Sequence, residues 1–187
     1  MFRRKNYFEL LEDIKAHPTM NSYVTRHEVS ADDLSIYISN KDIYDALKIL
    51  KDDDSFLFSQ LTDLCGVDWP EKEIRFEVVY NLLSMSNNSR IRVKSLTDEN
   101  NNIKSICKLF HCAEWYEREA FDLFGINFIG NKDLRRLLTD YGFEGHPLRK
   151  DFPLTGHVQE LQMKKGSVLA ADYILSPEGK MATSKMF

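Results

Sequence analysis

The sequence is poor in the features that would give this chain a catalytic activity of its own. It has three cysteines among 187 residues, so thiols alone cannot supply the four ligands of an iron–sulfur cluster. No apolar run reaches the roughly 18 residues that a membrane-spanning helix needs. The formal net charge is −4, which argues against nucleic acid because a phosphate-binding surface shows a basic excess. Any membrane association is therefore expected to go through partner proteins.

Glycine-rich and nucleophile motifs are also lacking. There is no Gly-x-Gly-x-x-Gly run, P-loop or nucleophile elbow, so no dinucleotide, phosphate or hydrolase site is predicted. Cys107 and Cys112 have the spacing of the first two ligands of a plant-type ferredoxin, but Trp115 stands where the third cysteine belongs. A zinc site is chemically possible from three cysteines and one histidine: Cys65, Cys107, His111 and Cys112. Because neighbours at a helix end rarely face one ion, buried structural cysteines are favoured, and no cofactor, metal or catalytic residue is predicted.

The N-terminus predicts no targeting segment. It starts basic, with Arg3, Arg4 and Lys5, but turns acidic at Glu9, unlike a secretory signal or an acid-poor transit peptide. The chain is therefore expected to be made where it works. An odd cysteine count without a secretion signal favours reduced thiols in a cytosol-like or matrix compartment.

Hydrophobic periodicity predicts helices and strands along the first two thirds of the chain. Helices are predicted, from apolar residues three or four apart, at 7–16, 42–51, 103–110 and 114–124. Alternating runs predict strands at 34–39, 56–64, 73–83 and 90–95, with a loop at 66–70 and a hairpin turn at 84–89. The order predicts an α+β fold with helices packed on a mainly antiparallel sheet. Residues 1–125 are predicted to form this domain, and residues 126–187 an extended segment and tail packing on it and on partners.

The predicted helix at 114–124 has an apolar and a charged side. At 100° per residue one arc suits a hydrophobic core: Ala113, Tyr116, Ala120, Leu123 and Phe124. On another arc Glu114, Arg118 and Asp122 lie four apart, so Arg118 is expected to bridge both carboxylates at roughly 0.2 to 0.5 kcal/mol per pair. Glu117 and Glu119 are two apart and point away from each other, which argues against an acid/base couple.

Two large aromatic residues lie on the charged side of this helix. Trp115 is among charged neighbours and Phe121 is beside Glu114, an arrangement typical of interface anchors surrounded by polar groups. Coverage by the chain's own C-terminal segment explains them equally well. Both interpretations stay open.

An extended basic segment follows the helix. Pro147 and Pro153 favour extended geometry around them, so residues 142–153, called the strap here, are predicted to lie along a surface without helix or strand. Four basic residues belong to this region or precede it: Arg135, Arg136, Arg149 and Lys150. They are expected to pair with carboxylates of the helix or of a neighbouring subunit, and at least two of the four within the chain.

The same residues carry a family resemblance. The region resembles the 30-kilodalton subunit of respiratory NADH:ubiquinone oxidoreductase (complex I), called subunit 9 when encoded in mitochondria. The match rests on Glu117-Arg118-Glu119, Asp122, Phe124-Gly125, Phe128, 133–138, 141–143, Gly145 and 147–153, and upstream on 61–70, 75–84 and 90–94. The chain departs from the family at Gly130-Asn131-Lys132, where members have Gly-His-Pro, and after Thr155, where the long charged extension of many members is absent.

The resemblance implies a non-catalytic, cofactor-free scaffold subunit of the quinone-reducing module in the peripheral arm. The partners that this resemblance implies are the 49-kilodalton-type subunit and neighbouring iron–sulfur subunits. The location that it implies is the matrix side of the mitochondrial inner membrane, or the cytoplasmic side of the plasma membrane in a bacterium. The implied motif and interface residues are Trp115, Glu117, Arg118, Glu119, Phe121, Asp122, Gly125, Arg135, Arg136, Pro147, Arg149, Lys150, Asp151, Phe152 and Pro153. Two alternatives remain: a homologous scaffold of a membrane-bound hydrogenase or formate hydrogenlyase, and an autonomous metalloenzyme using the cysteine and histidine set.

Overall fold

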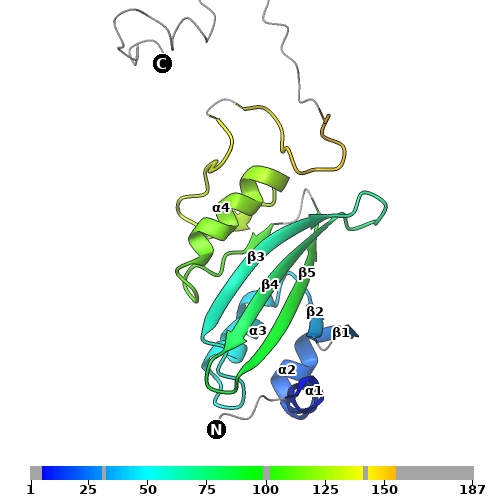
Figure 1. Ribbon diagram of the computed structural model, residues 1–187, viewed down its shortest axis with the longest axis vertical. Coiled ribbons are helices and arrows are strands. Elements are labelled where there is room, and N and C mark those ends of the chain that lie inside the picture. The colour runs from blue at the N-terminus through cyan, green and yellow to red at the C-terminus, as the bar shows by residue number, and fades with distance from the viewer. Residues whose placement is uncertain (1–5, 31–32, 99–101, 141–142, 155–187) are drawn as a thin grey trace, which may run out of the picture. The chain divides into compact units, whose positions relative to one another are not determined.

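A five-stranded mixed sheet forms the centre of the fold (Figure 1). The computed structural model describes residues 6–30, 33–98, 102–140 and 143–154, which lie within one compact unit, Met1–Leu154. The strand order is β1-β2-β5-β4-β3, from β1 (Val24–Ser30), β2 (Asp33–Ile38), β3 (Gln60–Asp68), β4 (Phe76–Ser84) and β5 (Ser89–Thr97). Within this sheet β2 and β5 pair in parallel and the other neighbours are antiparallel. The predicted α+β class with a mainly antiparallel sheet is therefore confirmed.

The described residues form four helices beside the sheet, and local chemistry sets where these helices begin and end. They are α1 (Tyr7–Ala16), α2 (Pro18–Tyr23), α3 (Ile43–Asp52) and α4 (Ala113–Phe124). The Asn6 N–H donates to Glu9 at 3.3 Å as α1 begins. His17 ends α1 and accepts the Met20 N–H at 3.1 Å, so that one side chain caps α2, with Pro18 at its first position. Three of the four predicted helices, at 7–16, 42–51 and 114–124, are thus confirmed within a residue.

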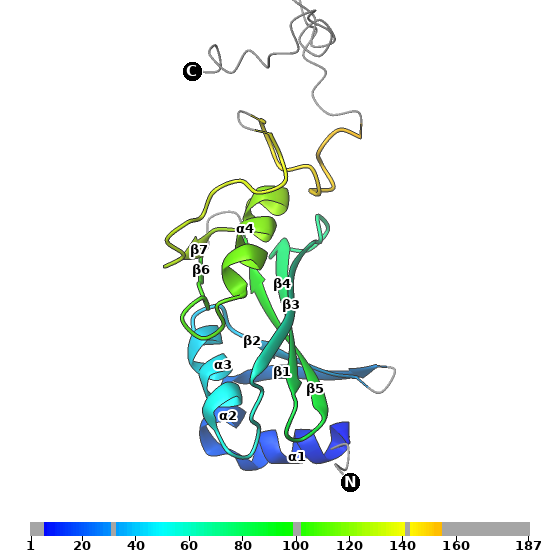
Figure 2. The same cartoon turned by 60° about the vertical axis from the view of Figure 1, so that its left-hand side comes forward.

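One hydrophobic core joins the helices to one face of the sheet. Along β4 the alternate residues Phe76, Val78, Tyr80 and Leu82 are all buried in it. Helix α4 packs along the edge strand β3 (Figure 2). Gly66 of β3 allows this approach, because a Cβ built there would lie 2.8 Å from Cδ2 of Phe124. No helix among the described residues is both long and apolar enough to cross a membrane.

Three predicted elements were wrong. The strand predicted at 56–64 begins only at Gln60 and continues through the predicted loop at 66–70 to Asp68, because Phe56 and Phe58 are buried in the turn after α3 instead. The helix predicted at 103–110 is the short strand β6 (Ile103–Lys104) followed by turns. Backbone groups pair β6 with β7 (Phe128–Ile129), and this tertiary pairing overrides the helical spacing of the apolar residues.

Helix α2 and strand β1 had no sequence prediction. Helix α2 is only 6 residues long, too short for its periodicity to be recognised. Strand β1 is mostly exposed and carries Thr25, Arg26, His27 and Glu28, so it has no clean apolar alternation. The division of the chain at residue 125 stays a prediction, and the predicted tail from 155 to 187 lies outside the described residues.

Candidate functional site

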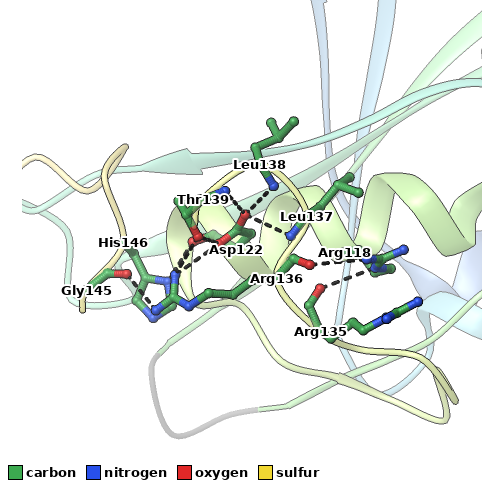
Figure 3. A network of polar contacts seen from close by, with 9 residues as sticks. All are labelled: Arg118, Asp122, Arg135, Arg136, Leu137, Leu138, Thr139, Gly145 and His146. Atoms are coloured by element: carbon green, nitrogen blue, oxygen red, sulfur yellow. Dashed lines mark hydrogen bonds and ion pairs between the residues drawn. The ribbon is translucent and has the colours of Figure 1, made fainter. Parts of the chain in front are cut away.

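The site is built around the carboxylate of Asp122, which is fully buried in α4 (Figure 3). Its Oδ2 accepts three consecutive backbone N–H groups, from Leu137 at 2.9 Å, Leu138 at 2.7 Å and Thr139 at 2.9 Å. Its Oδ1 accepts the Thr139 hydroxyl at 2.5 Å and Arg136 Nη1 at 3.0 Å. One carboxylate therefore holds the whole 136–139 loop against the helix.

The electrostatics keep this carboxylate ionised. Burial by itself raises the pKa of Asp122, but the hydroxyl and backbone N–H of Thr139 and the N–H groups of Leu137 and Leu138 outweigh it. The pKa of Asp122 therefore lies well below its usual range. Such a carboxylate accepts hydrogen bonds but carries no proton to donate near neutral pH.

Arg118 binds the same loop from a neighbouring position on α4. Its Nε donates to the carbonyl of Arg135 at 3.3 Å and its Nη2 to the carbonyl of Arg136 at 3.1 Å (Figure 3). Nη1 lies 3.6 Å from Asp133, and the guanidinium stacks 5.0 Å from the ring centre of Trp115. The predicted bridge from Arg118 to the helix carboxylates of Glu114 and Asp122 is therefore wrong.

Glu117 is the second buried carboxylate of α4. It accepts the Ile106 N–H at 2.7 Å, the Cys107 thiol at 3.2 Å and Asn131 Nδ2 at 3.0 Å. Burial first, and then the charge of Glu117, raise the pKa of Cys107 to about 12. The Glu117 carboxylate thus holds the turn before α4 and the loop after it against the helix. The Cys107 thiol stays protonated.

The predicted core arc of α4 is only partly correct. Ala113 and Ala120 are buried as expected, but Tyr116, Leu123 and Phe124 are only half-buried. The charged residues Glu117, Arg118 and Asp122 are buried in their place. Periodicity could not show this, because the compensating hydrogen bonds come from other parts of the chain. The backbone of residues 135–139 binds Arg118 and Asp122, and Ile106, Cys107 and Asn131 bind Glu117.

The strap closes the C-terminal end of α4. The last carbonyls of a helix have no partner within it. Here the carbonyl of Asp122 accepts His146 Nδ1 at 2.8 Å, that of Leu123 accepts the Leu148 N–H at 3.1 Å, and that of Phe124 accepts Arg149 Nε at 2.6 Å. The strap therefore acts as a helix cap that a later part of the chain supplies.

Gly125 makes this close approach possible. It takes a left-handed φ of 77° and ends α4. A Cβ built on it would lie 2.6 Å from Nε2 of His146 and also meet the guanidinium of Arg149. Any other residue would therefore be strained and would push the strap off the helix end.

His146 is placed as a neutral ring. Its Nδ1 carries the proton, because the carbonyl facing it only accepts, and the ring lies 6.3 Å edge-on from Phe121. Burial lowers the pKa of His146, and the positive charges of Arg149 and Arg136 lower it further, against the hydrogen bond and charge of Asp122. Phe121 is thus half-buried beside His146 of the strap, whereas Trp115 is 60% exposed.

A second anchor holds the far end of the strap to the β3–β4 hairpin. Arg75 donates through Nε to Asp68 at 2.7 Å and through Nη2 to Asp151 at 2.6 Å. Asp68 also accepts the Lys150 N–H at 2.7 Å. The hydrogen bonds from Arg75 hold the pKa of Asp68 and of Asp151 below the usual range.

The remaining predicted site residues fall into two groups. Phe152 stacks on Phe143 at 5.8 Å and is half-buried, as are Glu119 and Pro147. Arg135, paired with Asp133, is 65% exposed, and Lys150 and Pro153 are also exposed. The internal pairing predicted for part of the basic set is confirmed for Arg135 and Arg136.

Sequence reasoning missed Asp68, Arg75, Asn131 and Thr139. Opposite charges on either side of the loop that joins β3 to β4 were the available signal for Asp68 and Arg75. The zinc set does not come together: the Cys112 thiol faces the carbonyl of Leu61 at 3.7 Å while that of Cys107 faces Glu117. In the part of the chain that the structure describes, no three His, Cys, Asp or Glu side chains are placed to hold a metal ion.

The network lies within a region that matches a known family. Residues 36–158 match the model described as respiratory-chain NADH dehydrogenase, 30 Kd subunit. The chain belongs to this family. All residues of the Asp122 network, the strap and its anchor on the β3–β4 hairpin fall inside the matched range.

Several curated relatives are similar to this chain. It is 54% identical over 136 residues to the C subunit of the NADH-quinone oxidoreductase of Methylobacterium radiotolerans, covering 73% of this chain and 63% of that relative. It is 52% identical over 137 residues to NADH-ubiquinone oxidoreductase subunit 9 of Reclinomonas americana, covering 73% and 67%. The chain thus spans less than two thirds of some relatives it matches.

A solved structure shares the fold of this family member. A chain of the membrane-bound sulfane sulfur reductase, an archaeal respiratory membrane complex, superposes with a TM-score of 0.66 and 24% identity, covering 87% of this chain and 98% of its own. At that identity the likeness concerns the fold alone.

Proposed function

We propose that this chain is a non-catalytic scaffold subunit in the quinone-reducing module of a proton-pumping NADH:ubiquinone oxidoreductase. It supports electron transfer from NADH to ubiquinone without binding a cofactor itself. Family membership and identities of 54% and 52% to named subunits of such enzymes support this assignment. A scaffold subunit of a membrane-bound hydrogenase or formate hydrogenlyase is the weaker candidate, because the named relatives belong to NADH:quinone oxidoreductases.

The single observation that carries the scaffold role is how Asp122, Arg118, Arg136 and Arg149 are used. Each binds backbone groups of this same chain. A carboxylate that acts as a general acid or base works best with a pKa near the working pH, whereas the pKa of Asp122 is lowered far from it. The motif therefore maintains a surface shape and leaves the chemistry to other subunits.

The partners proposed are the 49-kilodalton-type subunit and neighbouring iron–sulfur subunits, at the matrix side of the inner membrane or its bacterial equivalent. Side chains that the fold leaves exposed support an interface here, above all Trp115 and Arg135. Tryptophan and arginine are the residue types enriched among energetically dominant interface positions.

Native purification through an affinity tag on this chain tests the proposal. The proposed partner subunits should co-purify, and NADH:quinone oxidoreductase activity should follow the intact assembly. The isolated chain should be colourless and give no paramagnetic iron–sulfur signal on reduction. Stoichiometric iron or flavin bound to the isolated chain, or co-purification with an unrelated set of proteins, would overturn the scaffold role.

A further inference from the structure

The two edges of the five-stranded sheet differ in how they are covered. At the β3 edge, α4 packs along the strand, and Tyr116 donates its hydroxyl to the carbonyl of Thr62 at 3.2 Å. The Cys112 thiol faces the next carbonyl, that of Leu61, at 3.7 Å. Among the described residues, β1 at the other edge is hydrogen-bonded on one side only, to β2. Figure 2 shows the ends of β1 and β2 projecting from the rest of the sheet.

The register shows which backbone groups of β1 point outward. Ser30 and Asp33 pair across two intervening residues, so they form the closing hydrogen-bonded pair of the hairpin. Hydrogen-bonded pairs alternate along an antiparallel ladder, which directs the backbone of Glu28 toward β2. The N–H and C=O groups of His27 and Val29 are therefore directed away from β2, along the free edge.

The side chains of β1 do little to block this edge. Lysines and other charged side chains, prolines, β-bulges and covering loops are the usual protection of exposed edges. β1 contains neither lysine nor proline, and its charged residues Arg26 and Glu28 form an ion pair with each other. The β-bulge between Val24 and Arg26 disturbs only its start. Val29 is 43% exposed although it shares a face with buried Leu34 opposite it, so an apolar position is left uncovered beside the free backbone groups.

We infer that β1 is a strand-addition site that pairs with an extended segment of another subunit of the assembly. The inference rests on the proposed function, which makes this chain one subunit among several. Added strands bind through backbone hydrogen bonds, here to His27 and Val29, and gain selectivity from alternate side chains.

The charges on β1 define the segment that fits. Arg26 and Glu28 lie on one face, 68% and 36% exposed, and form an ion pair with each other at 2.5 Å. They would occupy the close, non-hydrogen-bonded positions of the new ladder. The segment that fits carries an acidic side chain opposite Arg26 and a basic one opposite Glu28, which extend this ion pair, and an apolar one beside Val29. A second copy of this chain fits less well, because two bodies with a net charge of −4 repel each other.

Residue-resolved hydrogen exchange tests the inference on the wild-type chain, isolated and within the purified assembly. The amides of Arg26 and Glu28 should exchange slowly in both states because they bond to β2. The amides of His27 and Val29 should exchange about ten-fold or more slowly in the assembly than in the isolated chain. A ten-fold factor corresponds to about 1.4 kcal/mol. Unchanged exchange at His27 and Val29 in an intact assembly would overturn the inference while leaving the scaffold role standing.

A matched pair of variants gives a second measurement. His27→Pro removes the outward N–H, which an edge strand tolerates, whereas His27→Ala keeps it. Competitive incorporation into the assembly should fall about ten-fold for His27→Pro and stay normal for His27→Ala. Equal incorporation of both variants contradicts strand addition. If His27→Pro fails to fold, the wild-type exchange data decide. A dimer of the isolated chain by light scattering, with the same two amides protected, assigns the edge to a second copy and also overturns the inference.

Discussion

Asp122 shows how one side chain organises the region that carries the family motif. Five hydrogen bonds converge on its two oxygens, and three of them come from successive backbone N–H groups that have no strand or helix to bind. Without the carboxylate these donors would be left unsatisfied, at about 1 to 3 kcal/mol for each buried group.

Replacing Asp122 with Asn should therefore destabilise the isolated chain by about 2 to 4 kcal/mol, measured by urea denaturation. The exposed Asp140→Asn is the control and should change little. Because the folded pKa of Asp122 is lowered, its contribution is fully present above about pH 4 and is lost as the pH falls toward the folded pKa. The wild type should thus lose more stability than Asp122→Asn between about pH 4 and 2, and parallel curves for the two would contradict this role.

His146 gives a second pH dependence, in another range. Its pKa is lowered in the folded chain, so the unfolded chain binds the proton more readily. Wild-type stability should be full above about pH 6.5 and decrease as the pH falls below it. His146→Gln should make the denaturation midpoint vary less with pH over this range, whereas exposed His111→Gln should leave its pH dependence unchanged. A wild-type midpoint that does not vary between about pH 7.5 and 5.5 would show that the neutral ring is not required.

Among the secondary-structure elements, α4 and the strap depend on each other. The strap has no helix or strand among its described residues 143–153, and the last carbonyls of α4 lack partners in the helix. Contact between the strap and the helix end gives the strap a fixed position and gives these carbonyls partners, because His146, Leu148 and Arg149 bind three consecutive carbonyls of α4. Positive charge at a helix C-terminus adds a favourable interaction with the helix dipole.

Reversing the charge of Arg149 tests this cap. Its guanidinium donates to the Phe124 carbonyl and lies 5.1 Å from the ring centre of Phe76, so Arg149→Glu should lower the stability of the isolated chain by about 2 to 4 kcal/mol. Lys150→Glu, one residue away and exposed, should lower it by less than about 0.5 kcal/mol. Thermal denaturation of both variants makes the comparison. Equal, small effects would place Arg149 outside the cap and return it to the interface.

At the scale of the whole molecule and its assembly, the two large aromatic residues of α4 are expected to differ. Phe121 stabilises the fold, and Trp115 contributes to association with partner subunits. Phe121 is half-buried against His146, so Phe121→Ala should destabilise the isolated chain by about 1 to 3 kcal/mol. Trp115 is 60% exposed, so Trp115→Ala should leave the melting temperature within about 2 °C. It should instead weaken incorporation into the assembly by about 2 kcal/mol or more, as a dominant interface residue does. Native gels and melting curves of both variants measure this, and a large stability loss in Trp115→Ala would identify Trp115 as core.

The α+β class, three helices, the β4–β5 hairpin and the family could all be predicted from the sequence, because they depend on local periodicity and on the identity of residues. The sequence also indicated α4, with its charged residues Glu117 and Asp122, and the basic segment after it as the region of interest. It could not show which partners these charges bind. The predicted bridge from Arg118 within α4 follows from helix spacing alone, but in the folded chain Arg118 binds carbonyls 17 and 18 residues away.

Contacts formed only in the folded chain, by contrast, bury the charged side of α4, pair residues 103–104 with β7 where a helix was predicted, and hold β1 in a hairpin with β2. In each case the deciding hydrogen bonds use backbone groups: the N–H groups of 137–139 bind the Asp122 carboxylate, the Ile103 N–H binds the Asn127 carbonyl, and β1 pairs with β2. Backbone groups are nearly the same in every residue, so side-chain patterns alone do not reveal which of them meet. A charged side chain can be buried stably only where hydrogen-bonding groups of the folded chain contact it.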